Sequence, residues 1–188
     1  MPSRSQTKAT LFVTLLISLF TLLFGEYFTA EPVTLTSTKS NNLPLVFDKA
    51  QVVDVVDGDT IKVKALDTSP EFVTTPTYVV RLIGIDAPET HKPNAPKECY
   101  GEEATEYLRN LILGKTVTLK KDKSDTDKYN RLLRYVYLDD VFVNEALVQN
   151  GFAKAKAYKP DISMHDVLDA SQGLAVQRSA GMWGNCTL

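Results

Sequence analysis

The stretch of sequence that decides the fold runs from Ala50 to Leu66 and reads AQVVDVVDGDTIKVKAL. Its two halves, Ala50–Val56 and Ile61–Leu66, are rich in β-branched residues and alternate apolar with polar positions, as half-buried strands do. The Asp-Gly pair between them, at 57 and 58, is a strong short-range signal for a tight turn. The segment therefore predicts a β-hairpin with aspartates at its tip.

Downstream of the hairpin, three further apolar runs are predicted to be strands and three segments are predicted to be helices. The strands are Tyr78–Ile85, Thr116–Leu119 and Leu132–Leu138, and the helices are Gly101–Leu113, Asn144–Asn150 and Ser163–Ala180. Short strands outnumber helices, which favours a mainly β fold with helices, of the α+β class. The pattern suits a five-stranded OB-fold barrel with about three helices.

Residues 1–30 are predicted to be a targeting segment. Two basic residues precede an almost unbroken apolar run from Leu11 to Phe24. This run has the length of a signal-peptide core and is shorter than the roughly 20 residues of a membrane span. Cleavage at the end of the segment is expected, and the alternative is an uncleaved membrane anchor formed by residues 11–28. In either case the remaining chain is expected to be exported: secreted, periplasmic, or anchored and facing outward.

The rest of the chain divides into a linker and one domain. Residues 31–45 are rich in Thr, Ser, Asn and Pro and predict a linker, and residues 46–188 predict the folded domain. The formal net charge of −2 is unusual for a protein that grips nucleic acid. Residues 115–159, however, contain ten Lys and Arg against six Asp and Glu. This region predicts a modest basic face, and the alternative is an ordinary surface of mixed charge.

The chain has two cysteines, Cys99 and Cys186, which lie 87 residues apart. An even count in an exported protein favours a disulfide, because exported proteins meet oxidising conditions. The alternative is two unpaired thiols.

Three aspartates stand near predicted strand ends. Asp59 begins the second strand and Asp86 follows the third, and strand ends can converge at the mouth of a barrel. Two carboxylates with a backbone carbonyl and waters suit Ca²⁺, which takes several oxygen ligands in flexible geometry. Asp57 is placed to hold a metal-bound water. The alternative is that Asp57 and Asp59 only form the turn.

Three further charged residues suggest hydrolysis of a phosphodiester. Glu89 follows Pro88 and could deprotonate an attacking water, although an exposed loop glutamate is the usual alternative. Arg81 interrupts an apolar strand, so it must face either a ligand or a structural carboxylate. Arg131 opens the fifth strand after a charged loop and could stabilise the charge that develops on a phosphate.

Substrate contacts are predicted beside these residues. Lys128 and Tyr129 immediately precede the arginine at 131 and could touch a phosphate and a base. Tyr158 lies between two lysines and could stack on a base, the alternative being a partly buried core aromatic. The two histidines, His91 and His165, are too few and too far apart to suggest a zinc site.

From about Val46 to Trp183, roughly three quarters of its length, the chain resembles the staphylococcal nuclease (thermonuclease) family. The matching motifs are VDGDT at 56–60, RL at 81–82, IDAPET at 85–90, YGEEA at 100–104, DKYNR at 127–131 and GMW at 181–183. The resemblance implies an OB-fold and Ca²⁺-dependent hydrolysis of DNA and RNA that leaves 3′-phosphate ends. It makes Asp59, Asp86 and the backbone carbonyl of Ala87 the calcium ligands. It makes Glu89 the general base, with Arg81 and Arg131 as a phosphate clamp.

The sequence departs from the family pattern at several positions. Ala87 stands where the best-known member has Thr, a change that a carbonyl ligand survives. Asn130 replaces a Gly before the arginine at 131, and Asn tolerates unusual turn angles better than most residues. Near Tyr158 the family's paired tyrosines are reduced to one, which puts base stacking in question.

Three functions remain to be compared. The first is an exported calcium nuclease that acts as a monomer on single-stranded or flexible DNA and RNA, with no protein partner. The second is a non-catalytic OB-fold module that binds nucleic acid. The third is a surface-anchored interaction domain, for which the low overall charge is the only support. The intact Glu89, Arg81 and Arg131 favour the enzyme, because a binding module needs no general base.

Overall fold

A computed structural model describes residues 48–66, 76–90 and 96–187 of the chain. The predicted targeting segment, the whole of the predicted linker, and His91 lie outside these ranges, so those predictions remain predictions. Within the described ranges, no helix is both long and apolar enough to span a membrane.

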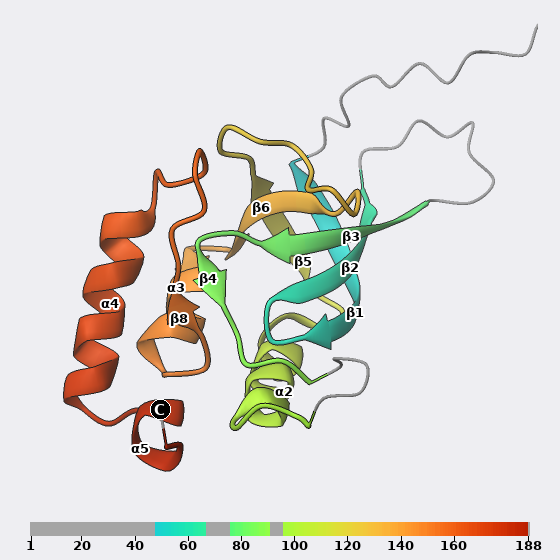
Figure 1. Ribbon diagram of the computed structural model, residues 1–188. Coiled ribbons are helices and arrows are strands. Elements are labelled where there is room, and N and C mark those ends of the chain that lie inside the picture. Colours follow the sequence, from blue (N-terminus) through green and yellow to red (C-terminus); the bar gives the residue numbers. More distant parts are fainter. Residues whose placement is uncertain (1–47, 67–75, 91–95, 188) are drawn as a thin grey trace, which may run out of the picture. The chain divides into compact units, whose positions relative to one another are not determined.

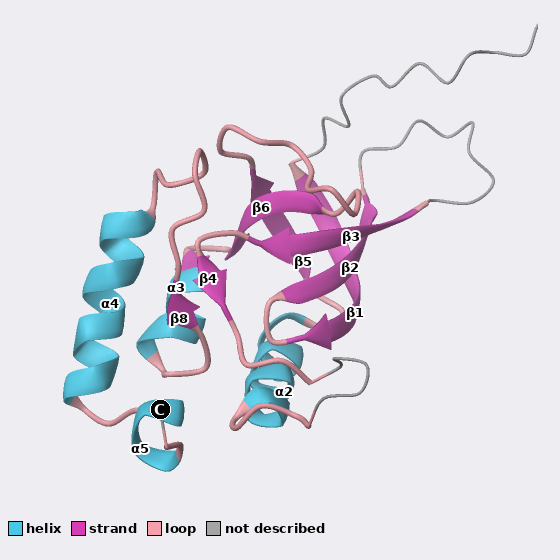
Figure 2. Cartoon of the chain, in the orientation of Figure 1, coloured by secondary structure: helices cyan, strands magenta, loops and turns pink. Residues whose placement is uncertain are grey.

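Five strands form a closed barrel, coloured magenta in Figure 2. They are β1 (Lys49–Asp57), β2 (Thr60–Ala65), β3 (Thr77–Leu82), β5 (Thr116–Lys120) and β6 (Leu132–Leu138). Hydrogen bonding follows the order β3-β2-β1-β5-β6, and a parallel pairing of β3 with β6 closes the circle. The other pairings in the barrel are antiparallel. This mixed barrel confirms the predicted α+β fold class and the OB-fold.

Alternating burial along the strands builds the core. The strand residues that point inward are almost completely shielded from solvent; they include Val52, Ile61, Val63, Val80, Leu82, Leu119 and Val136. Burial of a side chain of this size stabilises the fold by about 1.5–3 kcal/mol. The hairpin predicted from the first strands is present, with Ala50 opposite Ala65 and Asp57 opposite Thr60.

The third strand is shorter than predicted. β3 ends at Leu82, and the chain turns at Gly84, whose φ is 80°. Ile85 and Asp86 then form a separate strand, β4, which pairs with β8 (Lys154–Ala155) outside the barrel. The run from Tyr78 to Ile85 is apolar apart from Arg81 and Gly84, so hydrophobicity alone could not show the turn. The remaining short strand, β7 (Val141–Phe142), pairs with the end of β6.

The helices pack around the barrel. α2 (Gly101–Ile112) and α3 (Val143–Gln149) confirm two of the predicted helices. α4 (His165–Gln177) is shorter than predicted at both ends, and a single-turn helix, α5 (Met182–Asn185), follows it. α2 buries Ala104, Leu108 and Ile112 on one face, at the spacing of one side of a helix. Figure 1 shows α2 against the barrel and α4 farther out, beside α3 and β8.

A disulfide joins Cys99, just before α2, to Cys186, just after α5. The two Cα atoms are 6.0 Å apart. The predicted pairing is therefore confirmed, and the described residues contain no free cysteine. The bond ties the C-terminal end of the chain to the loop that follows β4.

Reduction of this disulfide is expected to lower the free energy of unfolding by on the order of 4 kcal/mol, because the bond closes a long loop and restricts the unfolded chain. Chemical denaturation with and without dithiothreitol measures the change. A Cys99→Ser, Cys186→Ser double variant is the control, since reductant should not affect it. Equal unfolding midpoints for the oxidised and reduced wild-type protein would contradict the expectation.

Candidate active site

Asp59 sits at the tip of the β1–β2 hairpin and is one of the few buried acidic residues. Its Oδ2 atom accepts a hydrogen bond of 2.9 Å from the backbone N–H of Ala87, and its Oδ1 accepts one of 3.1 Å from the Thr60 hydroxyl. The bond to Ala87 fastens the hairpin to the turn that follows β4. Strand ends far apart in sequence are thus brought to one mouth of the barrel.

Arg81, near the end of β3, binds both aspartates. Its Nη2 atom lies 2.9 Å from Oδ2 of Asp59 and 3.4 Å from Oδ1 of Asp86. The same guanidinium donates to the backbone carbonyls of Leu82 and Ile85, at 2.7 and 3.1 Å. Only 13% of its side chain is exposed. The structure therefore shows the carboxylate pairing considered for this arginine, and it also places the side chain at the edge of a pocket.

Asp57 and Gly58 shape the hairpin tip. The Asp57 carboxylate accepts a 3.0 Å hydrogen bond from the backbone N–H of Asp59, which is a turn-forming role. A Cβ atom added to Gly58 would lie 2.7 Å from the Cβ of Ala87 and 2.9 Å from that of Ala104. The tip can therefore approach the turn after β4 and helix α2 only because residue 58 has no side chain.

Burial raises the pKa of Asp59 to about 7, and the positive charge of Arg81 opposes the shift. Desolvation disfavours the charged form of a carboxyl group, so this group binds a proton more tightly than an exposed aspartate. A nearby cation would favour the ionised form.

The Asp59→Asn variant is expected to gain stability relative to the wild type as pH rises, in the absence of divalent cations. The folded-state pKa lies above the unfolded value, so the stability that proton binding contributes is present below about pH 4 and is lost as pH rises through about 7. The asparagine has no such titration; its amide oxygen can accept the bond from the Ala87 N–H, while its NH2 can donate to the Thr60 hydroxyl. The difference should reach a few kcal/mol at most.

Denaturant unfolding in EDTA across this pH range tests the expectation, with Asp169→Asn on the exposed side of α4 as the control. A stability difference between Asp59→Asn and wild type that does not change with pH would contradict it.

Asp86 carries two contacts besides Arg81. Nζ of Lys156 lies 2.8 Å from its Oδ2, and the Tyr158 hydroxyl lies 3.4 Å from its Oδ1. The hydrogen bond to Asp86 raises the pKa of Lys156, which therefore stays charged. Sequence reasoning singled out Tyr158 and passed over Lys156. The only sequence signal was that this lysine lies within the segment where the family's paired tyrosines are reduced to one.

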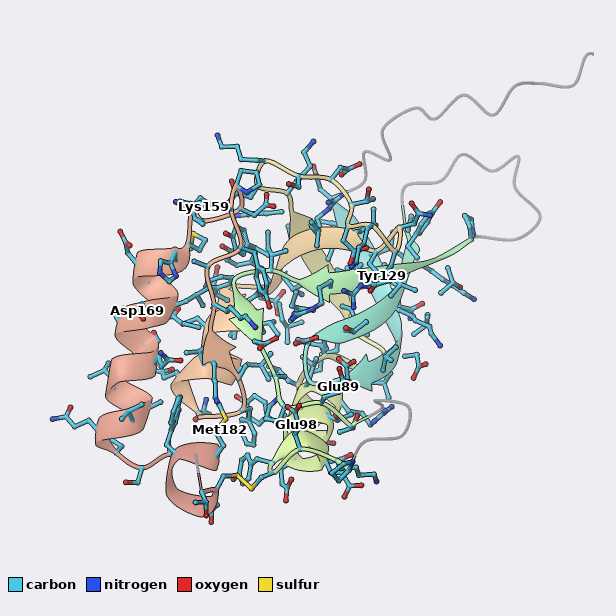
Figure 3. The ribbon with its side chains drawn as sticks, in the orientation of Figure 1. Glu89, Glu98, Tyr129, Lys159, Asp169 and Met182 are labelled. Carbon is cyan, nitrogen blue, oxygen red and sulfur yellow. A yellow bond between two sulfur atoms is a disulfide. The ribbon has the colours of Figure 1, made fainter. Side chains whose placement is uncertain are left out.

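Glu89 lies three residues beyond Asp86, on the loop that leads towards α2. Its backbone N–H donates to Oε2 of Glu98 at 3.1 Å, and its carbonyl accepts from the backbone N–H of Glu98 at 2.9 Å. Figure 3 labels both glutamates at the same corner of the molecule, above α2. Hydrogen bonds to Glu98 therefore fix the main chain of Glu89, the predicted base.

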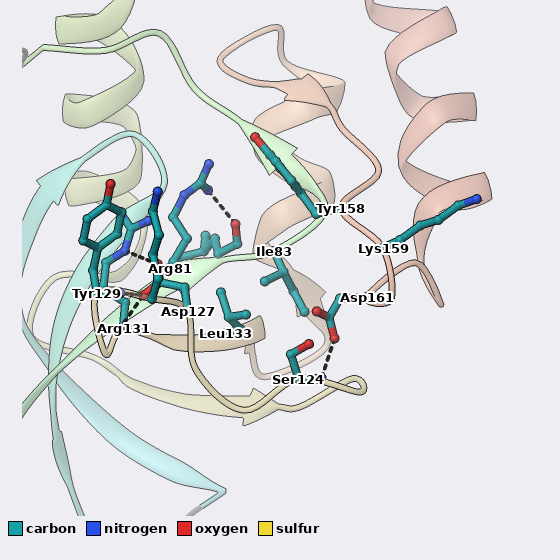
Figure 4. Close-up of a pocket in the computed structure, with 12 residues that line it drawn as sticks. Arg81, Ile83, Ser124, Asp127, Tyr129, Arg131, Leu133, Tyr158, Lys159 and Asp161 are labelled. Atoms are coloured by element: carbon teal, nitrogen blue, oxygen red, sulfur yellow. Dashed lines mark hydrogen bonds and ion pairs between the residues drawn. The ribbon is translucent and has the colours of Figure 1, made fainter.

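A pocket of about 490 Å³ opens beside the aspartates (Figure 4). It is lined by Arg81, Leu82, Ile83, Ser124, Asp127, Lys128, Tyr129, Arg131, Leu133, Tyr158, Lys159 and Asp161. Five predicted functional residues, Arg81, Lys128, Tyr129, Arg131 and Tyr158, therefore share one cavity. Figure 4 shows the Lys159 side chain pointing away from the two arginines. The lining combines apolar side chains with cationic, aromatic and acidic ones, a combination that suits a nucleotide.

Asp127 orients Arg131 in this pocket. The Arg131 Nε lies 2.7 Å from Oδ2 of Asp127, whose Oδ1 accepts backbone N–H bonds from Tyr129 and Arg131. Burial alone would raise the pKa of Asp127, but the hydrogen bonds from Arg131 hold it below the usual value. Asn130 has a φ of 60°, the unusual turn angle expected of it. Tyr129 is 68% exposed, and its ring centre lies 5.6 Å from Cζ of Arg131.

The donor atoms at the barrel mouth fit a hard divalent cation. Asp59 and Asp86 both approach the same guanidinium nitrogen, so their oxygens already converge around a positive charge. In the part of the chain that the structure describes, no group of three or more His, Cys, Asp or Glu side chains forms a metal cluster. A cation here would therefore rely on two carboxylates, backbone carbonyl groups and water, which Ca²⁺ accepts readily.

Fold and site together define a class of protein: an OB-fold barrel that carries a carboxylate and arginine site of the kind found in hydrolases. A family model described as "Staphylococcal nuclease homologue" matches residues 79–185, more than half of the chain. The chain belongs to the staphylococcal nuclease family, as its motifs predicted. It is thereby classed as a nuclease, a hydrolase that acts on phosphodiester bonds.

Individual relatives agree with this membership. The chain is 35% identical over 135 residues to a thermonuclease of Staphylococcus hyicus, covering 72% of this chain and 75% of that protein. It is 36% identical over 129 residues to a thermonuclease of Staphylococcus intermedius, covering 69% and 72%. It is also 35% identical over 130 residues to the endonuclease YncB of Bacillus subtilis (strain 168), covering 68% of this chain and 58% of that protein.

Proposed function

We propose that this protein is an exported, calcium-dependent nuclease that hydrolyses DNA and RNA and leaves 3′-phosphate ends. The observation that carries the proposal is the convergence of Asp59 and Asp86 on Arg81, at the edge of a pocket that also contains Arg131. The family relatives named as thermonucleases support the same reaction class.

In the proposed reaction a water attacks the phosphorus atom and the bond to the 5′-oxygen breaks. Glu89 takes the proton of the attacking water as general base. Arg81 and Arg131 neutralise the negative charge that develops on the phosphate oxygens. The departing 5′-oxygen gains a proton, so the products are a 3′-phosphate and a 5′-hydroxyl.

Asp59, Asp86 and the backbone carbonyl of Ala87 are the proposed ligands of a calcium ion. When bound, the ion supplies Lewis-acid polarisation of the phosphate. The two carboxylates contribute charge and orientation. Asp57 is proposed to support this arrangement indirectly, because its carboxylate accepts the hydrogen bond that fixes the backbone of Asp59.

The pocket beside the arginines is proposed to hold one nucleotide of the substrate. Lys128 and Tyr129 line it from the loop before β6, and Tyr158 lines it from the other side. Exposed aromatic rings stack on bases without strong sequence preference, so a broad range of DNA and RNA is expected to bind. A base reaches such a ring only when it is unpaired, which favours single-stranded or flexible substrate.

Two features support export. The predicted targeting segment at residues 1–30 would direct the chain out of the cytoplasm, and the Cys99–Cys186 disulfide suits an oxidising compartment. Residues 11–28 remain the alternative membrane tether. Calcium is plentiful outside cells, so a site with few protein ligands suffices there.

Cleavage of single-stranded DNA by the full-length protein is expected to require Ca²⁺ and to fall by at least about 10²-fold with EDTA, because the site loses its Lewis acid. Gel analysis of labelled DNA measures the rate, and removal of label by a 3′-phosphatase identifies the ends. The Asp59→Asn variant is the control, since it should fold but should not respond to calcium. Binding of DNA without cleavage at any calcium concentration would contradict the proposal and favour the binding module.

A further inference from the structure

The loop that carries Glu89 is fastened at its far end by Glu98. Two hydrogen bonds join these residues: Glu89 N–H to Glu98 Oε2 at 3.1 Å, and Glu98 N–H to the Glu89 carbonyl at 2.9 Å. Both polar groups of the Glu89 backbone are therefore engaged by one partner. Both bonds use the main chain of Glu89, so they fix the position of the backbone from which its carboxylate extends.

The start of α2 presses on the same loop. Gly101 donates its N–H to the carbonyl of Glu98 at 3.1 Å. A Cβ atom on Gly101 would lie 2.9 Å from the carbonyl oxygen of Pro88 and 2.9 Å from Cγ2 of Thr90. The backbone of the Glu98 turn and that of the Glu89 loop thus lie in direct contact. A shift of Glu98 would be transmitted to the loop.

The disulfide anchors this turn to the C-terminus. Cys99 follows Glu98 directly and is bonded to Cys186. The C-terminal end is itself fixed, because Met182 is fully buried and its N–H donates to the carbonyl of Gly151 at 2.9 Å. Figure 3 shows the disulfide as a yellow bond near Glu98. The clamp on Glu89 is therefore tied to the core through α5.

We propose that Glu98 is a positioning residue for Glu89, and that the Cys99–Cys186 disulfide holds Glu98 in place, so that the C-terminal tether sets the turnover rate. The inference rests on the proposed function, in which Glu89 is the general base. A base that is displaced by about 1 Å from a productive geometry can lose on the order of 10²-fold in rate. Substrate binding depends on the pocket at the other side of the barrel mouth and should change little.

Kinetics of the full-length protein on single-stranded DNA with Ca²⁺ test the proposal. Glu98→Ala is expected to lower kcat by about 10- to 100-fold with KM within about twofold. Glu98→Gln keeps an acceptor oxygen for the Glu89 N–H and should recover most of the rate. The Cys99→Ser, Cys186→Ser variant, assayed well below its unfolding temperature, should lose kcat in the same way. Glu98→Ala should lower kcat less in this disulfide-free variant than in the wild type, because both changes release the same constraint on Glu89.

The variants together distinguish the positioning role of Glu98 from the proposed catalytic role of Glu89. Glu103→Ala, on the exposed surface of α2, is the matched control and should be neutral. A normal kcat for Glu98→Ala, an effect on KM alone, or equal losses for the alanine and glutamine variants would overturn the positioning role. Glu89→Gln is measured in the same series. If that variant stays active, the proposed base is wrong; if it is inactive while Glu98→Ala is normal, only the positioning role fails.

Discussion

Glutamine in place of Glu89 is expected to lower kcat for DNA cleavage by about 10³-fold or more, with little change in folding. The amide has the shape of the carboxylic acid but cannot take a proton from water at neutral pH. Folding should survive because the two hydrogen bonds between Glu89 and Glu98 use the Glu89 backbone N–H and carbonyl, which the substitution leaves in place. Rates with Ca²⁺, together with thermal unfolding of each protein, provide the measurement.

Glu103→Gln is the matched control for this variant, because it removes one negative charge from α2 without touching the barrel mouth. It should cleave DNA at the wild-type rate. DNA affinity of Glu89→Gln should also be close to wild type, since neither the pocket nor its arginines is altered. Wild-type turnover by Glu89→Gln would remove this residue from the mechanism, and the water would need another base.

The parts of the site that could be predicted are those encoded by short segments. The hairpin tip follows from Asp-Gly between two alternating runs, and Asp59 comes with it. The DKYNR segment places Lys128, Tyr129 and Arg131 on one loop because the loop is short and is fixed by Asp127. In each case neighbours in sequence determine the geometry.

The parts that could not be predicted depend on partners distant in sequence. β4 exists because Ile85 and Asp86 pair with β8, some 70 residues later, and Gly84 alone in the run hints at the break from β3. Lys156 reaches Asp86 through the same pairing. Glu98 reads in the sequence as an ordinary loop residue, and its hydrogen bonds to the Glu89 backbone are visible only in the structure.

The sequence also could not show that Arg81 both pairs with two aspartates and lines the pocket. Its apolar strand indicated that it needed a partner, but both a ligand and a carboxylate satisfied that requirement. The structure places this arginine between the two aspartates and the pocket, so substitution would disturb the fold as well as the chemistry. Arg131 is the cleaner test of phosphate stabilisation, because it forms an ion pair with Asp127 on its own loop.

Arg131→Ala is expected to lower kcat by about 10³-fold, the scale of an arginine that stabilises a phosphoryl transition state. Asp127 binds Nε of Arg131 and so orients the guanidinium, whose side chain is 32% exposed in the pocket. Arg131→Lys should fall between alanine and wild type, because it keeps the charge but loses the planar fork that matches phosphate oxygens. Single-turnover cleavage at saturating DNA separates this effect from binding.

Arg178→Ala controls for the loss of a positive charge, since Arg178 lies at the end of α4 and does not line the pocket. Asp127→Asn adds a second comparison. It leaves Arg131 charged but weakens the interaction that orients the guanidinium. The cleavage rate of this variant should lie closer to that of Arg131→Lys than to that of Arg131→Ala. If Arg131→Ala raised KM alone, this arginine would bind the substrate and the transition state equally well. Transition-state stabilisation would then fall to Arg81, the other guanidinium of the pocket, because uniform binding does not raise kcat.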